Sequence, residues 1–241
     1  EDQLVYAYVT TPTDNRVVRL APGERPKPVL TGIPRGASGN RGGMTTDRKG
    51  ALLLVTGDAG DPGAALDPNS LAGKVINTLG APAEGNPTAG SPVLAGGLHA
   101  PGGVCTSLDG RWTWVTDRAP DRDVVYRVEP GKPLGAPAWA WPERPGVSGC
   151  ASWSDALSVA TSLAGNLQNL PIGPDGNFTG KPQVTMAEPN TGFGRIGGVD
   201  LLSDDVALGG TVNKDGGTPV SSDDRAVIII HPFGGGGGTK D

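Results

Sequence analysis

A strand-like pattern recurs four times along this chain and is half present once more. Each copy holds a small or Gly-rich stretch, an Asp-containing turn, an apolar run ending in Thr, and a second apolar run. Successive copies are 45, 60, 45 and 50 residues apart, as marked by Thr11, Thr56, Thr116, Thr161 and Thr211. Repeats of this length are typical of propellers and solenoids, in which no single repeat can bury its apolar faces alone.

The apolar runs predict short β-strands. They are rich in Val, Leu and Ile and are bounded by Gly, Pro, Asn and Asp, as strands between turns are. Hairpin turns are expected at Lys49-Gly50, Asp109-Gly110 and Asp175-Gly176, because Gly supplies the positive φ that such turns need. No segment carries a sustained helical stripe, so we expect very little helix. Four strands per repeat, as the spacing allows, make an all-β fold of antiparallel propeller blades.

The chain opens in the middle of a copy, with apolar runs at Leu4–Thr11 and Arg16–Leu20. A closed ring of blades leaves no open sheet face, so we expect that roughly one and a half blades of N-terminal sequence lie outside this chain. A self-contained smaller propeller is the alternative. We expect residues 1–233 to form one propeller domain and the Gly-rich residues 234–241 to form a flexible tail.

Composition excludes several classes of function. The formal net charge of −5 is modest and spread out, which argues against a nucleic-acid or anionic-membrane surface. No stretch approaches the roughly 18 apolar residues that span a bilayer. With only two His and two Cys, a zinc site built from such ligands is not expected. A phosphate-binding P-loop and a nucleophile elbow are also absent from the sequence.

The two cysteines occupy equivalent positions in neighbouring repeats. Cys105 and Cys150 each lie eleven residues before a marker threonine. In an oxidising compartment, two Cys would suggest a disulfide. Neighbouring sheets are roughly 10 Å apart, however, and a disulfide needs Cα atoms within about 7 Å. The distance between neighbouring sheets is smaller near a propeller axis. We therefore consider both a disulfide and two buried free thiols, and we favour the thiols.

The segments Val55–Pro62 and Asp67–Val75 carry the sharpest local motif. They resemble the T-G-D-A…Q-D-P-x-S-L-x-G-K-I pattern of the soluble PQQ-dependent glucose/sorbosone (aldose sugar) dehydrogenase family. The resemblance extends more loosely over most of the chain. It implies a six-bladed propeller with PQQ lying over the central channel, and a calcium ion beside it.

The C-terminal end resembles one branch of that family, the actinobacterial LppZ lipoproteins. The similar residues are Ile228–Pro232 and the Gly run that follows. This resemblance implies an exported cell-envelope protein on the outer face of the plasma membrane. Its only membrane attachment would be a lipid anchor in the N-terminal part outside this chain.

The resemblance also assigns the catalytic position. Family members carry a His in an H-x-G-G pattern, which takes the proton of the sugar hydroxyl while hydride moves to PQQ. The matching residue here is Asn40. An amide cannot accept a proton near neutral pH, so no catalytic residue is intact at that position. His99, in a neighbouring repeat, is a possible substitute base, with an ordinary loop His as the alternative.

The cofactor contacts implied by the resemblance are also reduced. The family's R-N-P-Q-G turn corresponds to His99–Gly103, which leaves Gly102 and Gly103 as contacts, and Arg41 lies beside Asn40. The family's R-x-R pair is reduced to Arg195, so one guanidinium remains where two would be wanted. Together these changes argue against PQQ chemistry, although the family implies both PQQ and calcium.

Several polar and aromatic groups have two interpretations. Asp58 and Asp61, with nearby Asp67 and Asn69, offer oxygen ligands for calcium, but turn capping is favoured. Four arginines either line an anion-accepting mouth or are ordinary solvated side chains: Arg41, Arg118, Arg122 and Arg195. His231 is expected to be a strand-end residue. Trp139 and Trp141 either form a sugar-stacking platform or, as favoured, pack under a loop.

These observations lead to one preferred function and two alternatives. The preferred function is a cell-envelope lipoprotein whose propeller binds a small molecule or an envelope partner without catalysis. The first alternative is an active PQQ-dependent aldose sugar dehydrogenase, an oxidoreductase with a remodelled site that uses His99. The second is a lactonase-like calcium propeller, for which Asp58 is the one ligand that can be placed on the channel.

Overall fold

The computed structural model describes residues 4–47, 50–78, 91–129, 132–187, 192–214 and 224–233. The chain divides into two compact units, one of Glu1–Pro101 with Val128–Gly135 and the other of Gly102–Arg127 with Ala136–Asp241. Among the described residues, no helix is long and apolar enough to cross a membrane. The expected tail, residues 234–241, lies outside the described residues.

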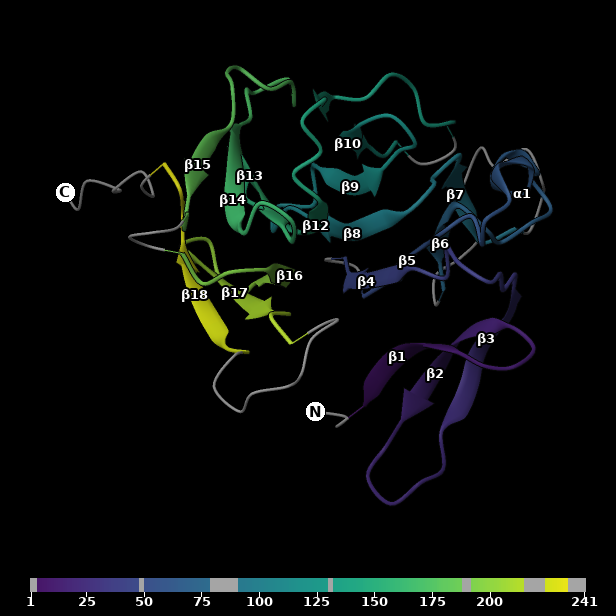
Figure 1. Cartoon of the computed structure of the whole chain (residues 1–241). Coiled ribbons are helices and arrows are strands. Elements are labelled where there is room, and N and C mark those ends of the chain that lie inside the picture. The colour runs from purple at the N-terminus through teal and green to yellow at the C-terminus, as the bar shows by residue number, and fades with distance from the viewer. Residues whose placement is uncertain are drawn as a thin grey trace. The chain divides into compact units, whose positions relative to one another are not determined.

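The first unit holds two antiparallel sheets and one short helix (Figure 1). One sheet has the order β1-β2-β3, and the other has the order β4-β5-β6-β7. Helix α1 is inserted between β5 and β6 and lies beside β6 and β7. The bounds are β1 Val5–Thr10, β2 Asn15–Leu20, β3 Lys27–Ile33, β4 Gly42–Thr46, β5 Leu52–Thr56, α1 Pro62–Leu66, β6 Lys74–Asn77 and β7 Val93–Gly96.

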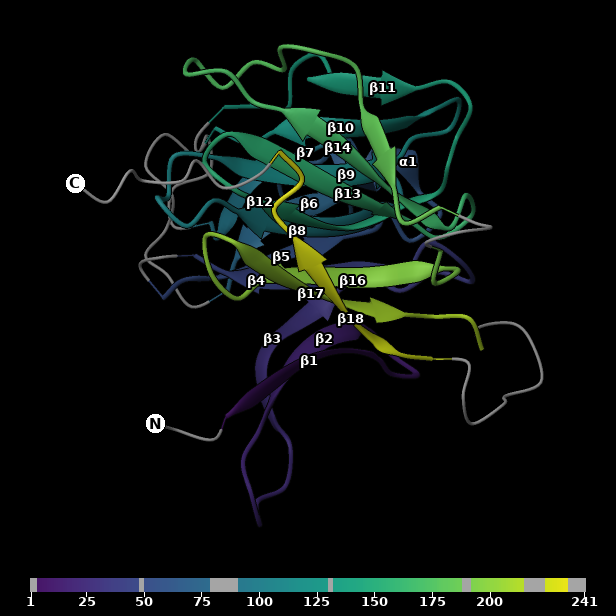
Figure 2. The same ribbon diagram turned by 90° about the vertical axis from the view of Figure 1, so that its left-hand side faces the viewer.

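The second unit holds three antiparallel sheets. Their orders are β11-β10-β9-β8, β12-β13-β14-β15 and β16-β17-β18. Figure 2 shows the last of these in yellow-green, with its three strands side by side. The bounds are β8 Pro101–Thr106, β9 Thr113–Arg118, β10 Asp123–Arg127, β11 Trp139–Trp141, β12 Val147–Ser152, β13 Ala156–Thr161, β14 Asn166–Pro171, β15 Gln183–Thr185, β16 Ile196–Leu201, β17 Val206–Thr211 and β18 Ala226–Ile230.

The repeat pattern corresponds to the sheets. Each marker threonine lies at or near the end of one strand, from β1 through β5, β9 and β13 to β17, and each full copy begins at the strand before it. The prediction of an all-β fold with very little helix is confirmed, since α1 is the single helix in the described part of the chain. The turn glycines Gly50, Gly110 and Gly176 all have positive φ, as expected, while Lys49 lies outside the described residues.

Burial differs between the sheets of the second unit. Every residue of β12 and β13 is buried, because both faces of that sheet are covered. In β18, by contrast, buried and exposed residues alternate, and Ile228 and Ile230 are exposed. The period-2 alternation shows that only one face of the last sheet is packed.

Glycines bring the first strands of the second unit's sheets close together. A Cβ atom on Gly102 of β8 would lie 2.6 Å from the Cα of Ser148 in β12. A Cβ atom on Gly149 of β12 would likewise lie 2.6 Å from the nitrogen of Val199 in β16. Contacts this short exclude any side chain, so the Gly-rich start of each repeat allows backbone to pack on backbone.

This close packing corrects the interpretation of the cysteines. Cys105 of β8 and Cys150 of β12 form a disulfide, with their Cα atoms 5.7 Å apart. The preference for two free thiols assumed the ordinary distance between packed sheets. Gly102 and Gly103, which face β12, reduce that distance to the range a disulfide needs.

The tryptophans serve mainly as core residues. Trp141 is 1% exposed and Trp114 is fully buried in the same cluster as the disulfide, where Trp114 stacks on Phe178. Trp112 and Trp139 pack against that cluster. The packing interpretation is therefore confirmed for Trp139 and Trp141. A sugar-stacking platform that includes Trp141 is wrong, because its ring is covered by protein.

Candidate functional site

Three loops of the first unit meet where their strands end. They are residues 34–41 after β3, residues 57–61 after β5 and residues 97–100 after β7. Backbone hydrogen bonds join them, namely Gly57 N to Arg41 O at 2.8 Å, Ala59 N to Gly39 O at 3.1 Å and Asp58 N to His99 O at 3.0 Å. These bonds bring the residues around Asn40, Asp58 and His99 into one cluster.

Glycine is required where these loops touch. Gly39 has a φ of +69°, and a Cβ atom there would lie 2.7 Å from the nitrogen of Gly60. A Cβ atom on Gly57 would lie only 2.2 Å from the carbonyl oxygen of Gly39. The Gly residues of the T-G-D-A-G segment therefore set the distance between the loops that carry Asn40 and Asp58.

Asp58 and His99 form a hydrogen-bonded pair. The Oδ2 atom of Asp58 lies 2.5 Å from Nδ1 of His99, and Oδ1 accepts a bond from the nitrogen of Gly60 at 2.8 Å. The side chain of Asp58 is 1% exposed and that of His99 is 39% exposed. A buried carboxylate that accepts the Nδ1 proton leaves Nε2 as the basic atom of the neutral imidazole. This is the geometry of an oriented general base.

Asn40 has a structural role in the loop. Its Nδ2 donates to the carbonyl oxygen of Gly36 at 2.8 Å, and its Oδ1 accepts from the nitrogen of Gly36 at 3.0 Å. Oδ1 also accepts from Nδ2 of Asn15 at 3.0 Å. An amide presents its donor and acceptor side by side, whereas the nitrogens of an imidazole point apart. The residue at the family's base position is therefore adapted to closing a loop.

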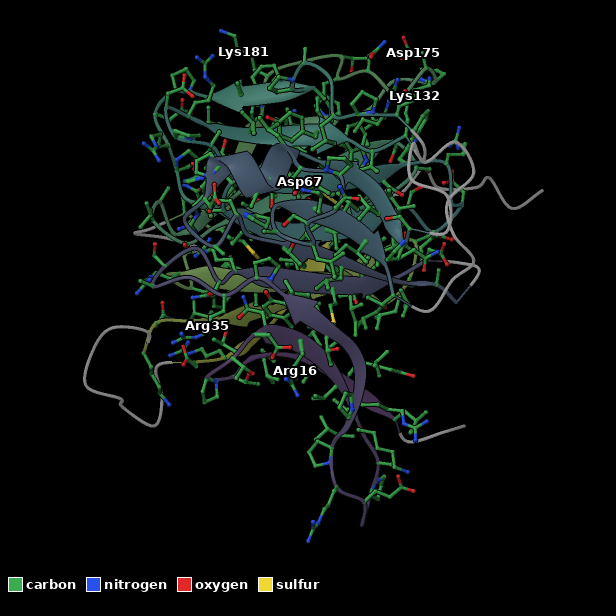
Figure 3. The ribbon with its side chains drawn as sticks, turned by 90° about the vertical axis from the view of Figure 1, so that its right-hand side faces the viewer. Arg16, Arg35, Asp67, Lys132, Asp175 and Lys181 are labelled. Carbon is green, nitrogen blue, oxygen red and sulfur yellow. A yellow bond between two sulfur atoms is a disulfide. The ribbon has the colours of Figure 1, made fainter. Side chains whose placement is uncertain are left out.

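The acidic side chains near Asp58 cap turns. Asp61 is the N-cap of α1 and accepts bonds from the nitrogens of Gly63 and Ala64 at 2.9 and 3.2 Å. Asp67, at the other end of α1 (Figure 3), accepts from the nitrogen of Asn69 at 2.9 Å. The capping interpretation of these residues is confirmed. Within the described ranges, no three His, Cys, Asp or Glu side chains are grouped to hold a metal ion.

Lys74 is a buried cation that the sequence patterns did not indicate. Its side chain is 2% exposed, and Nζ donates to the carbonyl oxygens of Ala64, Ala65 and Ala72 at 2.9, 2.6 and 2.8 Å. Burial lowers its pKa to about 8, while Asp67 acts in the opposite direction. Because Ala64 and Ala65 lie in α1, the ammonium group ties the helix to β6.

An apolar cavity of about 310 Å³ adjoins Lys74. It lies in the first unit and is lined by Ala65, Leu66, Pro68, Lys74, Val93, Leu94, Ala95, Gly96, Lys132 and Pro133. All three ammonium protons of Lys74 have carbonyl acceptors, so the cavity offers a ligand mainly apolar contacts.

Two of the candidate arginines, Arg118 and Arg195, lie in the second unit and make internal contacts. Nε of Arg195 donates to the carbonyl oxygen of Ser162 at 3.1 Å. Arg118 donates to the carbonyl oxygens of Val147 and Gly146 at 2.9 and 3.0 Å and to the hydroxyl of Ser162 at 2.6 Å. A carboxylate ligand would have to compete with these bonds. As they are arranged here, Arg118 and Arg195 therefore do not fit PQQ, which needs cationic groups directed at its carboxylates.

The remaining candidates have ordinary surroundings. Arg122 is exposed and pairs with the adjacent Asp121, and Arg41 is exposed at the end of its loop. His231 is buried at the end of β18, where Nε2 bonds to Asp155 at 2.9 Å and the ring packs edge-on against Trp153. The strand-end interpretation of His231 agrees with this position.

Comparison with known proteins relates this fold to sugar dehydrogenases. No family model matches the chain, and no curated protein matches it by sequence. Among solved structures, it is similar to the PQQ-bound aldose sugar dehydrogenase of Streptomyces coelicolor. The two are 28% identical with a TM-score of 0.82, over 94% of this chain and 75% of that one.

Two other solved structures have a similar fold. A putative oxidoreductase (glucose dehydrogenase) of Thermus thermophilus is 27% identical with a TM-score of 0.79, over 95% of this chain and 78% of that one. The soluble aldose sugar dehydrogenase of Escherichia coli, in its apo form, is 16% identical with a TM-score of 0.67, over 95% and 77%. At that identity the last comparison supports the fold alone. The chain thus has an all-β, propeller-type fold similar to that of PQQ-dependent aldose sugar and glucose dehydrogenases.

Proposed function

We propose that this protein binds a small molecule or a protein partner through a sugar-dehydrogenase-like propeller and does not catalyse sugar oxidation. One observation carries the proposal. Asn40, at the position where the resemblance expects the proton acceptor, uses both ends of its amide to hold Gly36. An amide has no basic lone pair near neutral pH, and this one is already committed to the loop.

The basic residues of the second unit support the same conclusion. Arg118 and Arg195 donate to carbonyl and hydroxyl oxygens of the protein. The loss of one arginine from the family's R-x-R pair further weakens a site for a tricarboxylated quinone. Binding without catalysis agrees with a propeller whose strands and loops are kept while its cofactor contacts are reassigned.

A PQQ titration tests this proposal. The protein is mixed with PQQ and calcium chloride, and quinone absorbance on the protein is measured after gel filtration, with the Streptomyces coelicolor enzyme as the positive control. We expect no stoichiometric quinone on this protein and no dye reduction when glucose or another aldose is added. Stoichiometric PQQ together with aldose-dependent dye reduction would refute a non-catalytic function.

The Asp58–His99 pair favours a second candidate, an active dehydrogenase. A buried carboxylate that orients an imidazole is the arrangement a general base needs. In that case dye reduction would be measurable in the unaltered protein and would be lost in both Asp58→Asn and His99→Gln. Arg122→Gln, an exposed change outside the three loops, is the matched control and should keep the activity.

We also propose that the protein is exported and attached to the cell envelope by lipid. The disulfide between Cys105 and Cys150 supports export, because structural disulfides persist mainly in oxidising compartments. The lipid anchor and the outer face of the plasma membrane rest on the LppZ resemblance. Cell fractionation with fatty-acid labelling tests them: the full-length protein should be labelled and recovered with the membrane, and a soluble, unlabelled protein would contradict the anchor.

A further inference from the structure

The apolar cavity beside α1 has a buried floor and an exposed rim. Its floor is formed by the buried residues Ala65, Lys74 and Ala95. Its rim is formed by the exposed residues Leu66, Pro68, Lys132 and Pro133. The volume of about 310 Å³ is in the range of small-molecule sites, and the exposed rim gives a ligand access from solvent.

Small side chains on β7 leave this space open. β7 is the outermost strand of its sheet and reads VLAG, whereas β11, the outermost strand of another sheet, reads WAW. The rings of Trp139 and Trp141 pack in or against the core beside β11. At Gly96 of β7 there is no side chain, and a Cβ atom there would lie 2.9 Å from Cδ of Lys74. An empty apolar cavity lacks dispersion contacts that an apolar ligand can restore.

The charged side chains at the cavity are cationic. Of the described residues that line it, Lys74 and Lys132 carry charge. Lys74 donates all three ammonium protons to carbonyl oxygens of the protein. Lys132 pairs with Glu129, but its side chain is 70% exposed, and exposed pairs of this kind contribute little. Because an ammonium group has three donors, Lys132 can also bond to an anion at the rim.

We propose that this cavity binds a small amphipathic monocarboxylate, with an aliphatic chain against α1 and β7 and its carboxylate at Lys132. At about 30 Å³ for a group the size of a water molecule, 310 Å³ holds about ten such groups. A fatty acid of about ten carbons therefore matches the cavity in size, in its apolar body and in the sign of its charge.

This site is separate from the loops that carry Asn40. The cavity lining shares no residue with residues 34–41, 57–61 or 97–100. The proposal therefore goes beyond the proposed function, and the PQQ titration does not bear on it.

Calorimetric titration of the protein with octanoate, decanoate and tetradecanoate tests the proposal, at concentrations below micelle formation. We expect a single bound molecule per chain. Each CH₂ group from octanoate to decanoate should raise the affinity by about fourfold, because it is transferred from water to the cavity. Tetradecanoate should gain little over decanoate, because its extra carbons stay outside. Absence of saturable binding would overturn the proposal, as would an equal gain per CH₂ group up to tetradecanoate.

A charge reversal at the rim tests the position of the carboxylate. Lys132→Glu should weaken decanoate binding by about tenfold or more, because an attraction is replaced by a repulsion. Binding of 1-decanol, which has the same chain without the charge, should be unchanged in this variant. Lys27→Glu is the matched control, since Lys27 is also exposed and pairs with a Glu three residues earlier. An equal loss for decanoate and decanol in Lys132→Glu would overturn the assignment of the carboxylate to Lys132.

A second set of variants tests whether the chain lies in the cavity. Leu66→Glu changes a rim residue that is 77% exposed, so the fold should be kept while decanoate binding weakens. Leu202→Glu, at a position 61% exposed in the second unit, should leave binding unchanged. Ala95→Leu places a larger side chain on the floor and should weaken both decanoate and decanol. If Ala95→Leu does not fold, the two exposed leucines decide. Decanoate affinity that is unchanged in both Lys132→Glu and Leu66→Glu would overturn the proposal.

Discussion

Raising the pH from 8 to 10 should stabilise this protein through Lys74. The folded protein holds this amine where burial lowers its pKa from 10.5 to about 8. Between these two values the unfolded chain binds the proton and the folded chain does not. The free energy of unfolding therefore rises with pH across this window, and below pH 8 the cost of burying the charge is present in full.

The size of the effect follows from the two pKa values. Integrating the proton difference from pH 8 to pH 10 gives a gain of about 2 kcal/mol for a single amine with these values. No thiol is available to reshuffle the disulfide at high pH, because both cysteines of the chain are bonded. The measurement stops at pH 10 because of Tyr8, whose pKa burial raises in the folded protein. Above that pH, tyrosines of the unfolded chain lose their proton while Tyr8 of the folded chain keeps it, which lowers the free energy of unfolding and opposes the effect of Lys74.

Urea unfolding at pH 8, 9 and 10 measures this gain, with two matched variants. Lys74→Met keeps a long side chain but cannot titrate, so its stability should be flat across the window. Lys132→Met removes an exposed lysine from the rim of the same cavity (Figure 3) and should keep the full rise. A rise in Lys74→Met as large as that of the unaltered protein would show that Lys74 is not its source.

Three further predictions test the disulfide, the loop amide and the loop contact. Cys150→Ser should lower the free energy of unfolding by about 4 kcal/mol in the chain-entropy estimate for a 45-residue loop, and an unchanged urea midpoint would contradict it. Asn40→His should gain no aldose-dependent dye reduction. Its free energy of unfolding, measured by thermal unfolding, should fall by about 1–3 kcal/mol because the bonds to Gly36 are lost. Activity in this variant would refute the structural role. Gly57→Ala should lower the free energy of unfolding by about 1–3 kcal/mol, because its Cβ atom would lie 2.2 Å from Gly39 O. The control Gly198→Ala, whose Cβ atom would have nothing within 4 Å, should be nearly neutral. Equal melting temperatures of the two variants would refute the contact.

Local features of the fold could be read from neighbouring residues in the sequence. The strands, the positive-φ turns at Gly110 and Gly176, and the Asx caps at Asp61 and Asp67 all follow from residues within a few positions of one another. Their spacing along the chain then predicted repeated sheets. Such features depend on backbone geometry and on short-range hydrogen bonds, which the local sequence carries in full.

Contacts between residues that are distant in sequence could be identified only in the folded chain. Asp58 and His99 are 41 residues apart, and their bond depends on how three loops stack at Gly39 and Gly57. The disulfide depends in the same way on how closely β8 approaches β12, and a sequence pattern does not measure that distance.

The chemical role of a side chain was likewise settled by what surrounds it after folding. Asn40 could be recognised from the sequence as unable to act as a base, but its bonds to Gly36 are a property of the loop. The burial of Lys74 could not be inferred from the sequence, because a lysine is normally exposed, and its three carbonyl partners come from α1 and the turn that precedes β6. The order of residues specified the repeating strands, whereas contacts between strands and loops specified which groups are paired, buried or able to titrate.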